Sequence, residues 1–379
     1  MKQIQGKPLS NFSHNIIGKI SHKPSRSLKK EDFILVTDDD MPISGYGAVF
    51  TTKPSSSMKG TAIVCNADDV VYLKDGDIVS IEPGGNINIV YEKDSIHNAL
   101  LVTERCNSSC VMCPQFLATK EDDKTPNLLK IISLMDKNTP LLGITGGEPT
   151  LIGERLIEIL NACKRMLPQT KVVILTNGIR LEYFEYVKRL VMIEHHDLTF
   201  DIPLYSDTDT EHNNIVGTNG FYKTIYGLYN LARFNQKIGI RIVMHKLNYN
   251  RLPQLAEFIY HNFPFVYHIA FMQMETQGLA RENLEKIWID PYDYNKQLEE
   301  AVFYLFRRAM HVSIYNAQLC ILPKSLWKFA RKSISSWKNI YLDECNECEQ
   351  KIHCGGFFSS SLDLHSEHIK ASKMNKDFP

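Results

Sequence analysis

The sequence has no excess charge of either sign, no long apolar run and no internal repeat. Lys plus Arg and Asp plus Glu both number 43, so the formal net charge of the 379 residues is zero. A neutral chain has no overall field that attracts nucleic acid or an anionic membrane, and we expect neither as a partner. No apolar stretch reaches the roughly 18 residues of a membrane-spanning helix. The start, MKQIQGKPLSNFSHN, lacks the apolar segment of a secretion signal, so we expect a cytoplasmic protein.

Nine cysteines are present, most of them in two groups. Disulfides rarely persist in the cytoplasm, so clustered cysteines there indicate metal or redox ligands. Cys65 ends an apolar stretch and Cys163 lies in a helical pattern, and both are interpreted as core residues.

Periodicity divides the chain into four parts. Residues 1–96 are predicted to form a small antiparallel β domain, because short β-rich runs alternate with turns. Residues 97–315 alternate apolar runs with helical stretches, which is typical of βαβ units around a parallel sheet. A cysteine-rich extension at 316–360 and a polar, flexible tail at 361–379 follow. Strands of the first part are expected at 33–37, 47–52, 60–65, 70–73, 77–82 and 86–92.

The second part contains six predicted strand-helix units. The strands are expected at 99–104, 141–145, 171–176, 197–205, 239–245 and 265–272. The helices are expected at 126–137, 153–167, 181–193, 220–236, 252–262 and 292–310. The units predict an α/β fold built on a partial (β/α)6 TIM-like barrel. Barrels of this kind carry their chemistry at the C-terminal ends of the strands, so the residues after each strand are the first candidates for a site.

Three cysteines directly follow the first of these strands, in TERCNSSCVMCPQ. The polar residues between them favour a turn, and Pro114 disfavours helical geometry at the residue before it. Cys106, Cys110 and Cys113 therefore lie on a loop that can curl around one object. Thiolates select zinc or iron-sulfur clusters, and both usually take four ligands.

The fourth ligand is missing from this loop. Glu104 and Glu121 are the nearest alternatives, and they match a structural zinc site poorly. A [4Fe-4S] cluster held by three cysteines instead leaves one iron open to a small molecule.

The second strand runs directly into the segment GGEPT. Gly146 and Gly147 allow the backbone to approach a ligand closely, Glu148 can accept a hydrogen bond from an ammonium group, and Pro149 stiffens the turn. A glycine pair alone also fits an ordinary structural turn.

The three-cysteine spacing, with GGEP after the next strand, resembles the radical S-adenosylmethionine (SAM) superfamily over about residues 97–290. One departure is Met112, where many members carry an aromatic residue. The resemblance implies a [4Fe-4S] cluster on the three cysteines, with the amino and carboxylate groups of SAM on the open iron. Reductive cleavage of SAM would then give a 5'-deoxyadenosyl radical, with the cofactors carrying the chemistry and the protein orienting them.

The resemblance also implies SAM contacts after the later strands. GGEPT matches the segment that meets the methionine amino group. Asn177 could bind SAM or simply form a turn, and Ser206 could contact the ribose although Pro203 stands where many relatives have a serine. Arg241 could meet the SAM carboxylate or form a surface salt bridge, and His245 is interpreted equally well as a core histidine.

The second cysteine group consists of Cys320, Cys345, Cys348 and Cys354. Four thiolates can close a structural zinc site or an auxiliary [4Fe-4S] cluster, with His353 as an alternative ligand. The spacing resembles the auxiliary-cluster extensions of radical SAM peptide maturases. Those often carry another cysteine where this chain has Phe358, so the resemblance implies one auxiliary cluster.

Long stretches on both sides of Cys320 resemble the His-Xaa-Ser system radical SAM maturase, C-type. That resemblance implies a ribosomal precursor peptide with His-Xaa-Ser repeats, a second radical SAM maturase as partner, and an electron donor such as flavodoxin or ferredoxin. Two alternatives remain: radical chemistry on a small molecule or RNA, and a zinc-thiolate binding module without turnover. The N-terminal β domain could offer an edge strand to the peptide or cover the floor of the barrel.

Overall fold

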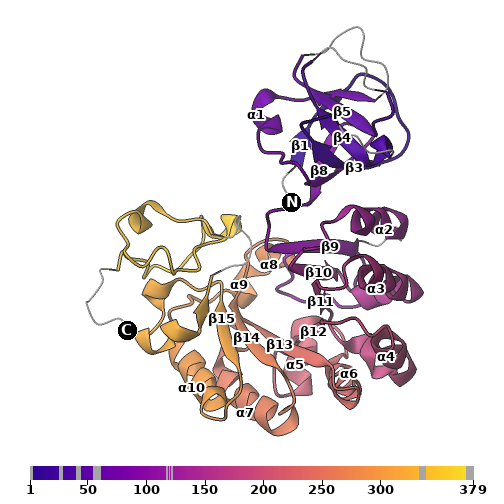
Figure 1. The fold of residues 1–379 in the computed structure, drawn as a ribbon. Coiled ribbons are helices and arrows are strands. Elements are labelled where there is room, and N and C mark those ends of the chain that lie inside the picture. The colour runs from indigo at the N-terminus through magenta and orange to yellow at the C-terminus, as the bar shows by residue number, and fades with distance from the viewer. Residues whose placement is uncertain are drawn as a thin grey trace.

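The computed structural model describes residues 3–24, 29–39, 44–53, 61–116, 118, 120, 123–332 and 339–372. A small β domain at the N-terminus is followed by a large α/β domain, and the C-terminal segment lies beside the last strands of the large sheet (Figure 1). Within these residues, no helix has the length and apolar character needed to cross a membrane.

The N-terminal domain is one sheet with strand order β1-β8-β7-β3-β4-β5-β6-β2. Its elements are β1 (Gln3–Gln5), β2 (Lys7–Pro8), β3 (Ile16–Ser21), β4 (Phe33–Val36), β5 (Ala48–Thr51), β6 (Ala62–Val64), α1 (Ala67–Val70), β7 (Ile78–Ile81) and β8 (Asn86–Tyr91). The expectation of an antiparallel sheet is confirmed where β1 pairs with β8, β8 with β7, β7 with β3 and β6 with β2, but it is wrong for β3 to β6, which pair in parallel. Each of these strands is joined to the next by a connection long enough for the chain to cross over. The strand expected at 70–73 is also absent, since those residues end α1 and form a turn.

The first and last strands in this order, β1 and β2, belong to one continuous segment of the chain. β1 pairs with β8, β2 pairs with β6, and only Gly6 lies between β1 and β2. The Gly6 amide donates to the Gly85 carbonyl at 2.9 Å, and a Cβ atom on Gly6 would lie 2.4 Å from Ile63 Cγ2. The segment thereby closes the sheet into a small barrel. Where β6 and β8 are paired in this way, they offer no free edge to a peptide.

The large domain is a parallel sheet with strand order β16-β15-β14-β13-β12-β11-β10-β9. Its strands are β9 (His97–Thr103), β10 (Leu141–Gly146), β11 (Lys171–Leu175), β12 (Leu198–Pro203), β13 (Lys237–Met244), β14 (His268–Gln273), β15 (Val312–Tyr315) and β16 (Ala330–Arg331). Its helices are α2 (Thr125–Leu134), α3 (Glu154–Met166), α4 (Phe184–Val191), α5 (Asp209–Val216), α6 (Phe221–Arg233), α7 (Leu252–Asn262), α8 (Leu279–Glu282), α9 (Leu284–Ile287) and α10 (Asn295–Phe306). The six predicted strand-helix units and the α/β partial TIM-like barrel are confirmed. The sheet continues with β15 and β16, so the six predicted strands fall short by two, and the last strand comes from the predicted C-terminal extension.

The two faces of the large sheet differ in what they contact. Figure 1 shows α2, α3, α4, α6, α7 and α10 along its outer side. Side chains alternate along each strand, so Ile240 and Ile242 enter the core shared with the helices, whereas Arg241 points to the opposite face. We call that opposite face the inner face.

The N-terminal domain packs against α2 and the loop before β10. The Tyr91 hydroxyl lies 2.8 Å from the Thr139 hydroxyl, and Lys130 of α2 forms an ion pair with Asp32. Ile17 and Ile78 join the core of the large domain. This position is at the N-terminal end of β10, away from the edge that carries the cysteine loop, and it agrees better with a role in covering the barrel floor.

Candidate functional site

The cysteine loop begins directly after β9, at the C-terminal edge of the large sheet. Cys106, Cys110 and Cys113 lie close enough to influence one another electrostatically. Burial raises the pKa of Cys110 to about 12 and the pKa of Cys106 to about 11. Thiolates buried in this way need a positive partner, and a metal centre supplies one because metal binding displaces thiol protons. The donor set and its surroundings therefore fit an iron-sulfur cluster.

A single metal ion fits this loop less well. Among the described residues, no three His, Cys, Asp or Glu side chains are grouped closely enough to hold one ion. Each iron of a cluster takes its own thiolate, so the sulfurs surround the cluster and do not converge on one point. Of the two alternative fourth ligands, Glu104 pairs with Lys124 at 2.8 Å, and Glu121 lies outside the described residues.

Backbone hydrogen bonds from two later segments hold the cysteine loop in place. The amides of Ser109 and Val111 each donate, at 3.0 Å, to carbonyls at the end of α5. The Cys113 carbonyl accepts from the amide of Ala280 in α8, also at 3.0 Å. The loop is therefore anchored on both sides by parts of the chain that follow β12 and β14.

A glycine makes one of these contacts possible. Gly217, just after α5, has φ of +66°, and a Cβ atom there would lie 2.2 Å from Ser109 Oγ. Any larger residue would strain the backbone and displace the cysteine loop at the same time.

We expect Gly217→Ala to lose iron from the three-cysteine site as well as stability. The matched control is Gly153→Ala, because Gly153 also has positive φ, +58°, but a Cβ atom there would have no neighbour within 4 Å. Gly217→Ala should lose about 1–2 kcal/mol from the left-handed backbone conformation, and Gly153→Ala should lose at least as much, because its ψ of −116° lies outside the left-handed region. Thermal unfolding measures that loss, and iron per chain after anaerobic reconstitution should fall only in Gly217→Ala. Equal iron in both variants would show that the contact with Ser109 does not matter for the site.

The segment GGEP lies against the start of the cysteine loop. The Gly147 amide donates to the Thr103 carbonyl at 2.9 Å, and the Glu148 amide donates to the Arg105 carbonyl at 2.8 Å. A Cβ atom on Gly147 would lie 2.2 Å from the Arg105 oxygen, so only glycine allows this approach. Gly146 and Gly147 thus position the cysteine loop, a role that the sequence did not reveal, and their contact with SAM stays a prediction.

The Glu148 carboxylate is fully buried and joins the ends of β10 and β11. It accepts from the Thr150 amide at 2.9 Å, the Thr150 hydroxyl at 2.5 Å, the Thr176 hydroxyl at 2.6 Å and the Asn177 amide at 2.6 Å. Burial raises its pKa. Pro149 next to it begins a short 3-10 turn. An ammonium group would have to share oxygens that these four donors already occupy, and the predicted contact of Glu148 and Pro149 with SAM stays a prediction.

Asn177 connects β11 to the cysteine loop. Its side-chain amide donates to Asn107 Oδ1 at 2.7 Å and to Ser108 Oγ at 3.3 Å. Its own oxygen accepts from the Ile179 amide at 3.0 Å. Both ends of the side chain are therefore engaged within the protein, and a role in binding SAM stays a prediction.

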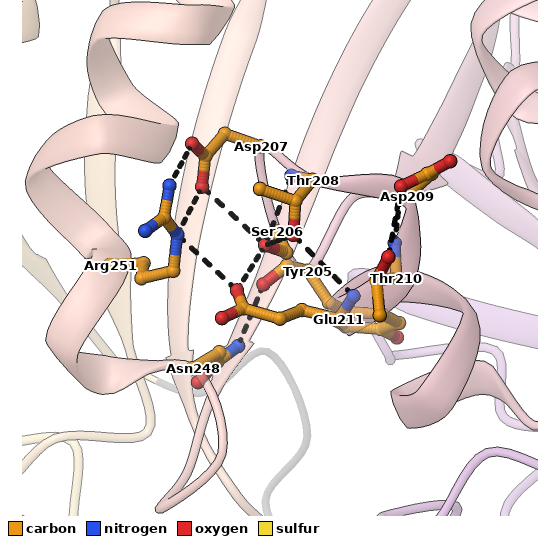
Figure 2. A network of polar contacts seen from close by, with 9 residues as sticks. All are labelled: Tyr205, Ser206, Asp207, Thr208, Asp209, Thr210, Glu211, Asn248 and Arg251. Atoms are coloured by element: carbon orange, nitrogen blue, oxygen red, sulfur yellow. Dashed lines mark hydrogen bonds and ion pairs between the residues drawn. The ribbon is translucent and has the colours of Figure 1, made fainter.

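Ser206 lies in a polar network after β12, which Figure 2 shows. Its buried hydroxyl donates to Glu211 Oε2 at 2.7 Å and accepts from the Thr208 amide at 3.2 Å. Arg251 holds Asp207 through Nε at 2.9 Å and Nη2 at 2.5 Å, and its Nε lies 3.3 Å from Glu211. The hydroxyl proton is thus committed to Glu211, so a ribose hydroxyl could meet Ser206 only as a donor. The ribose contact stays a prediction.

Arg241 lies half-buried on the inner face of β13. Its Nη2 is 3.4 Å from Met272 Sδ, and in the described part of the chain no carboxylate lies within 4.0 Å of it. The alternative of a surface salt bridge therefore finds no support there. Binding of the SAM carboxylate stays a prediction.

Tyr205 is a residue of this site that the sequence did not single out. Burial raises the pKa of its hydroxyl, with Cys110 acting in the same direction and Arg241 opposing it. The side chain also packs with Met112 in one apolar cluster. Tyr205 follows Pro203 by two residues, which places both on the inner face, and this spacing could have identified Tyr205 from the sequence. His245, by contrast, is a buried histidine whose pKa burial lowers to about 4.

The second cysteine group comes together in one pocket. The pocket is lined by Gln318, Leu319, Cys320, Tyr341, Cys345, Cys348, Gln350, Lys351, Cys354, Phe357 and Lys370. The Leu319 amide points to Cys354 Sγ at 3.5 Å, and the Ser372 amide points to Cys348 Sγ at 3.4 Å. Amide donors aimed at sulfur stabilise thiolates. As at the first loop, no three ligand side chains among the described residues are grouped closely enough for one ion, so this donor set fits a cluster better than a single zinc ion. His353 is exposed and does not line the pocket.

The segment after the second cysteine group is packed, contrary to the expected flexible tail from residue 361. Ser366 is buried, the His368 ring stacks on Tyr292 with centroids 3.9 Å apart, and Ser372 reaches the cysteine pocket. The polar composition of this segment did not predict these contacts. Histidine and serine side chains can nevertheless be buried when their polar atoms are hydrogen-bonded. Residues 373–379 lie outside the described residues.

One family model matches part of the chain. Residues 100–259 match the family model of the radical SAM superfamily. No curated protein matches the chain. Similar solved structures include Streptococcus suis SuiB, with TM-score 0.47 and 20% identity, covering 59% of this chain and 49% of that one. Another is anSMEcpe with bound AdoMet and a Kp18Cys peptide, with TM-score 0.43 and 16% identity, covering 57% and 63%. A radical SAM methyltransferase from Sphaerobacter thermophilus has TM-score 0.45 and 11% identity, covering 65% and 74%.

The chain spans about half the length of the Streptococcus suis protein. The matched residues begin within β9 and end within α7, so they include the cysteine loop, GGEP, Asn177 after β11 and Arg241 on β13. Residues 100–259 therefore form a radical SAM domain.

Proposed function

We propose that this chain is a radical SAM enzyme with an auxiliary [4Fe-4S] cluster, and that it modifies a ribosomally made peptide with His-Xaa-Ser repeats. A second radical SAM protein and an electron donor such as flavodoxin or ferredoxin would act with it, all in the cytoplasm. The observation that carries the proposal is the pairing of two different thiol sites on one chain: three cysteines on the loop after β9 and four around one C-terminal pocket. The choice of peptide rests on the sequence resemblance.

Each cysteine site suits a different role. With a [4Fe-4S] cluster and SAM bound, the three-cysteine site supplies reductive cleavage of SAM and a 5'-deoxyadenosyl radical. The chain's own residues fix that site: the α5 and α8 backbone and GGEP hold the loop, while Arg241 offers a positive charge on the inner face that forms no ion pair with the described residues. Four thiols at the second site can fill all cluster positions, which suits substrate binding or electron acceptance.

Coexpression with a short His-Xaa-Ser repeat peptide and with the partner protein tests the proposal. We expect a mass change in the peptide that appears only when this chain is present and its cysteine loop is intact. Release of 5'-deoxyadenosine from reconstituted protein, SAM and a reductant should accompany it. SAM cleavage without any change in the peptide would point instead to a small-molecule or RNA substrate. Colourless protein that contains zinc and releases no 5'-deoxyadenosine would favour a thiolate-zinc binding module.

A further inference from the structure

Residues 366–372, which we call the strap, run from the large domain to the pocket of the second cysteine group. Near the start of the strap, the Glu367 amide donates to Asp290 Oδ2 at 3.1 Å, and the His368 ring stacks on Tyr292 with centroids 3.9 Å apart. Asp290 and Tyr292 belong to the loop between α9 and α10. The strap is therefore fastened to the large domain before it reaches the cysteines.

Ser372 is held to the second cysteine group by both of its backbone groups. Its amide donates to Cys348 Sγ at 3.4 Å, and its carbonyl accepts from the Glu349 amide at 3.2 Å. The two partners are adjacent residues, so the bonds together fix the direction in which the Ser372 amide points. The Leu319 amide makes a similar contact with Cys354 Sγ at 3.5 Å, but Leu319 belongs to a cysteine-bearing segment, whereas the strap carries no cysteine. The strap therefore supports the sulfur atoms and supplies no ligand of its own.

Positive charge gathers at the same pocket. Lys351 and Lys370 are among the residues that line it, and no Asp or Glu of the described chain is. Lys351 Nζ lies 5.2 Å from the centre of the Tyr341 ring, which also lines the pocket, and 3.1 Å from Asn346 Oδ1. The acidic residues within 343–349 are exposed to solvent. The side chains at the pocket thus oppose the negative charge of the thiolates.

Both features act on the charge of an iron-sulfur cluster held by these cysteines. The thiolates make the cluster negative, and reduction by one electron adds another negative charge. Hydrogen bonds to the sulfurs and nearby cations stabilise the reduced form and raise the reduction potential, whereas burial under the strap stabilises the less charged, oxidised form. The strap thus acts in two opposite directions, and a test must separate the amide from the burial.

We propose that the strap closes the pocket of the second cysteine group, and that the Ser372 amide and the Lys351 ammonium group raise the reduction potential of the cluster there. Ser372 and Lys351 are positioning residues, because they act through the cluster and its ligands and touch no substrate. The inference rests on the proposed function, which assigns an auxiliary [4Fe-4S] cluster to this pocket. A cluster that is reduced readily suits electron acceptance, one of the two roles proposed for the site.

Ser372→Pro and Ser372→Ala test the amide as a matched pair, because proline removes the N–H group whereas alanine removes only the side-chain hydroxyl. Both are made in Cys110→Ala protein, which lacks a ligand of the loop cluster, so that the remaining iron lies in the second site. The reduction potential is measured by titration with dithionite, and electron paramagnetic resonance follows the reduced cluster. A hydrogen bond to a charged acceptor shifts an equilibrium about ten-fold, so Ser372→Pro should lower the potential by about 59 mV. Ser372→Ala should leave it unchanged.

Lys351 is tested by charge in the same Cys110→Ala protein, with no change of the backbone. Lys351→Gln should lower the reduction potential, because it removes a positive charge beside the cysteines. Lys351→Arg keeps the charge and should keep the potential. This pair decides the electrostatic part of the inference even where Ser372→Pro displaces the strap.

Closure by the strap is measured separately, as the rate at which an iron chelator bleaches the second cluster. Tyr292→Ala removes the ring that stacks on His368, and loss of such a contact should raise the bleaching rate about five-fold. Tyr226→Ala is the control, since Tyr226 is also an exposed tyrosine but lies on α6. Its bleaching rate should equal that of the background protein.

Each part of the inference has an outcome that would overturn it. Equal potentials in Ser372→Pro and Ser372→Ala, with iron retained, would reject the role of the amide. Equal potentials in Lys351→Gln and Lys351→Arg would reject the role of the lysine, and an unchanged bleaching rate in Tyr292→Ala would reject closure by the strap. Zinc in place of iron at the second site of the Cys110→Ala protein would instead contradict the proposed function.

Discussion

We expect Cys110→Ala to abolish release of 5'-deoxyadenosine by anaerobically reconstituted protein that is supplied with SAM and a reductant. Cys110 is a partly buried thiol of the loop, and burial raises its pKa to about 12. Alanine would remove one of three ligands and leave a cluster with too few thiolates to stay bound. The loss should exceed a thousand-fold, the scale on which cofactor-dependent chemistry stops when its cofactor is missing. Chromatography with mass detection measures the product.

Cys163→Ala provides the control for this variant. Cys163 is also buried and also has a pKa that burial raises to about 12, but it lies in α3 within the main core. It should keep both iron and turnover, so that a general effect of removing a buried thiol is separated from the loss of a ligand. Turnover by Cys110→Ala at the rate of the unaltered protein would contradict the assignment of the cysteine loop as the site of the SAM-binding cluster.

Replacing Cys345 and Cys348 together by serine should lower the iron content from about eight to about four atoms per chain. Both thiols line the C-terminal pocket, and Cys345 lies within electrostatic reach of Cys348 and Cys354. The remaining two cysteines cannot hold a cluster alone, whereas the loop after β9 is separate and should keep its iron. Colorimetric iron analysis and the visible absorption spectrum measure the change.

The metal of the C-terminal site is decided by the same double variant. Protein that keeps all its iron and loses zinc would show that the pocket is a structural zinc site. Cys65→Ala is the control, since Cys65 is a buried thiol of the N-terminal barrel and should affect neither metal.

The strands of the large domain could be predicted because they are buried in a parallel sheet and read as short apolar runs. β13 and β14 show this, with Ile240, Ile242 and Phe271 in the core. β15 and β16 were not predicted because they have only four and two residues, too few to show the two-residue period of a strand. The direction of strand pairing in the N-terminal sheet could not be predicted for another reason. Alternation of apolar and polar residues identifies a strand but does not specify which strands pair with it.

The cysteines of both sites could be predicted from their local spacing, whereas the residues that contact and position them could not. Ser109 and Gly217 contact each other although they are 108 residues apart in the sequence. Such contacts depend on strand order and register, and neither is encoded in a local motif.

The segment that closes the N-terminal barrel makes solubility depend on a few residues. β1 and β2 cover the outer edges of β8 and β6, and both belong to the stretch from Gln3 to Pro8. Loss or displacement of this stretch would uncover two strand edges in one event. An uncovered edge presents unpaired amides and carbonyls to other chains, so the closed domain would gain two surfaces for intermolecular strand pairing and aggregation.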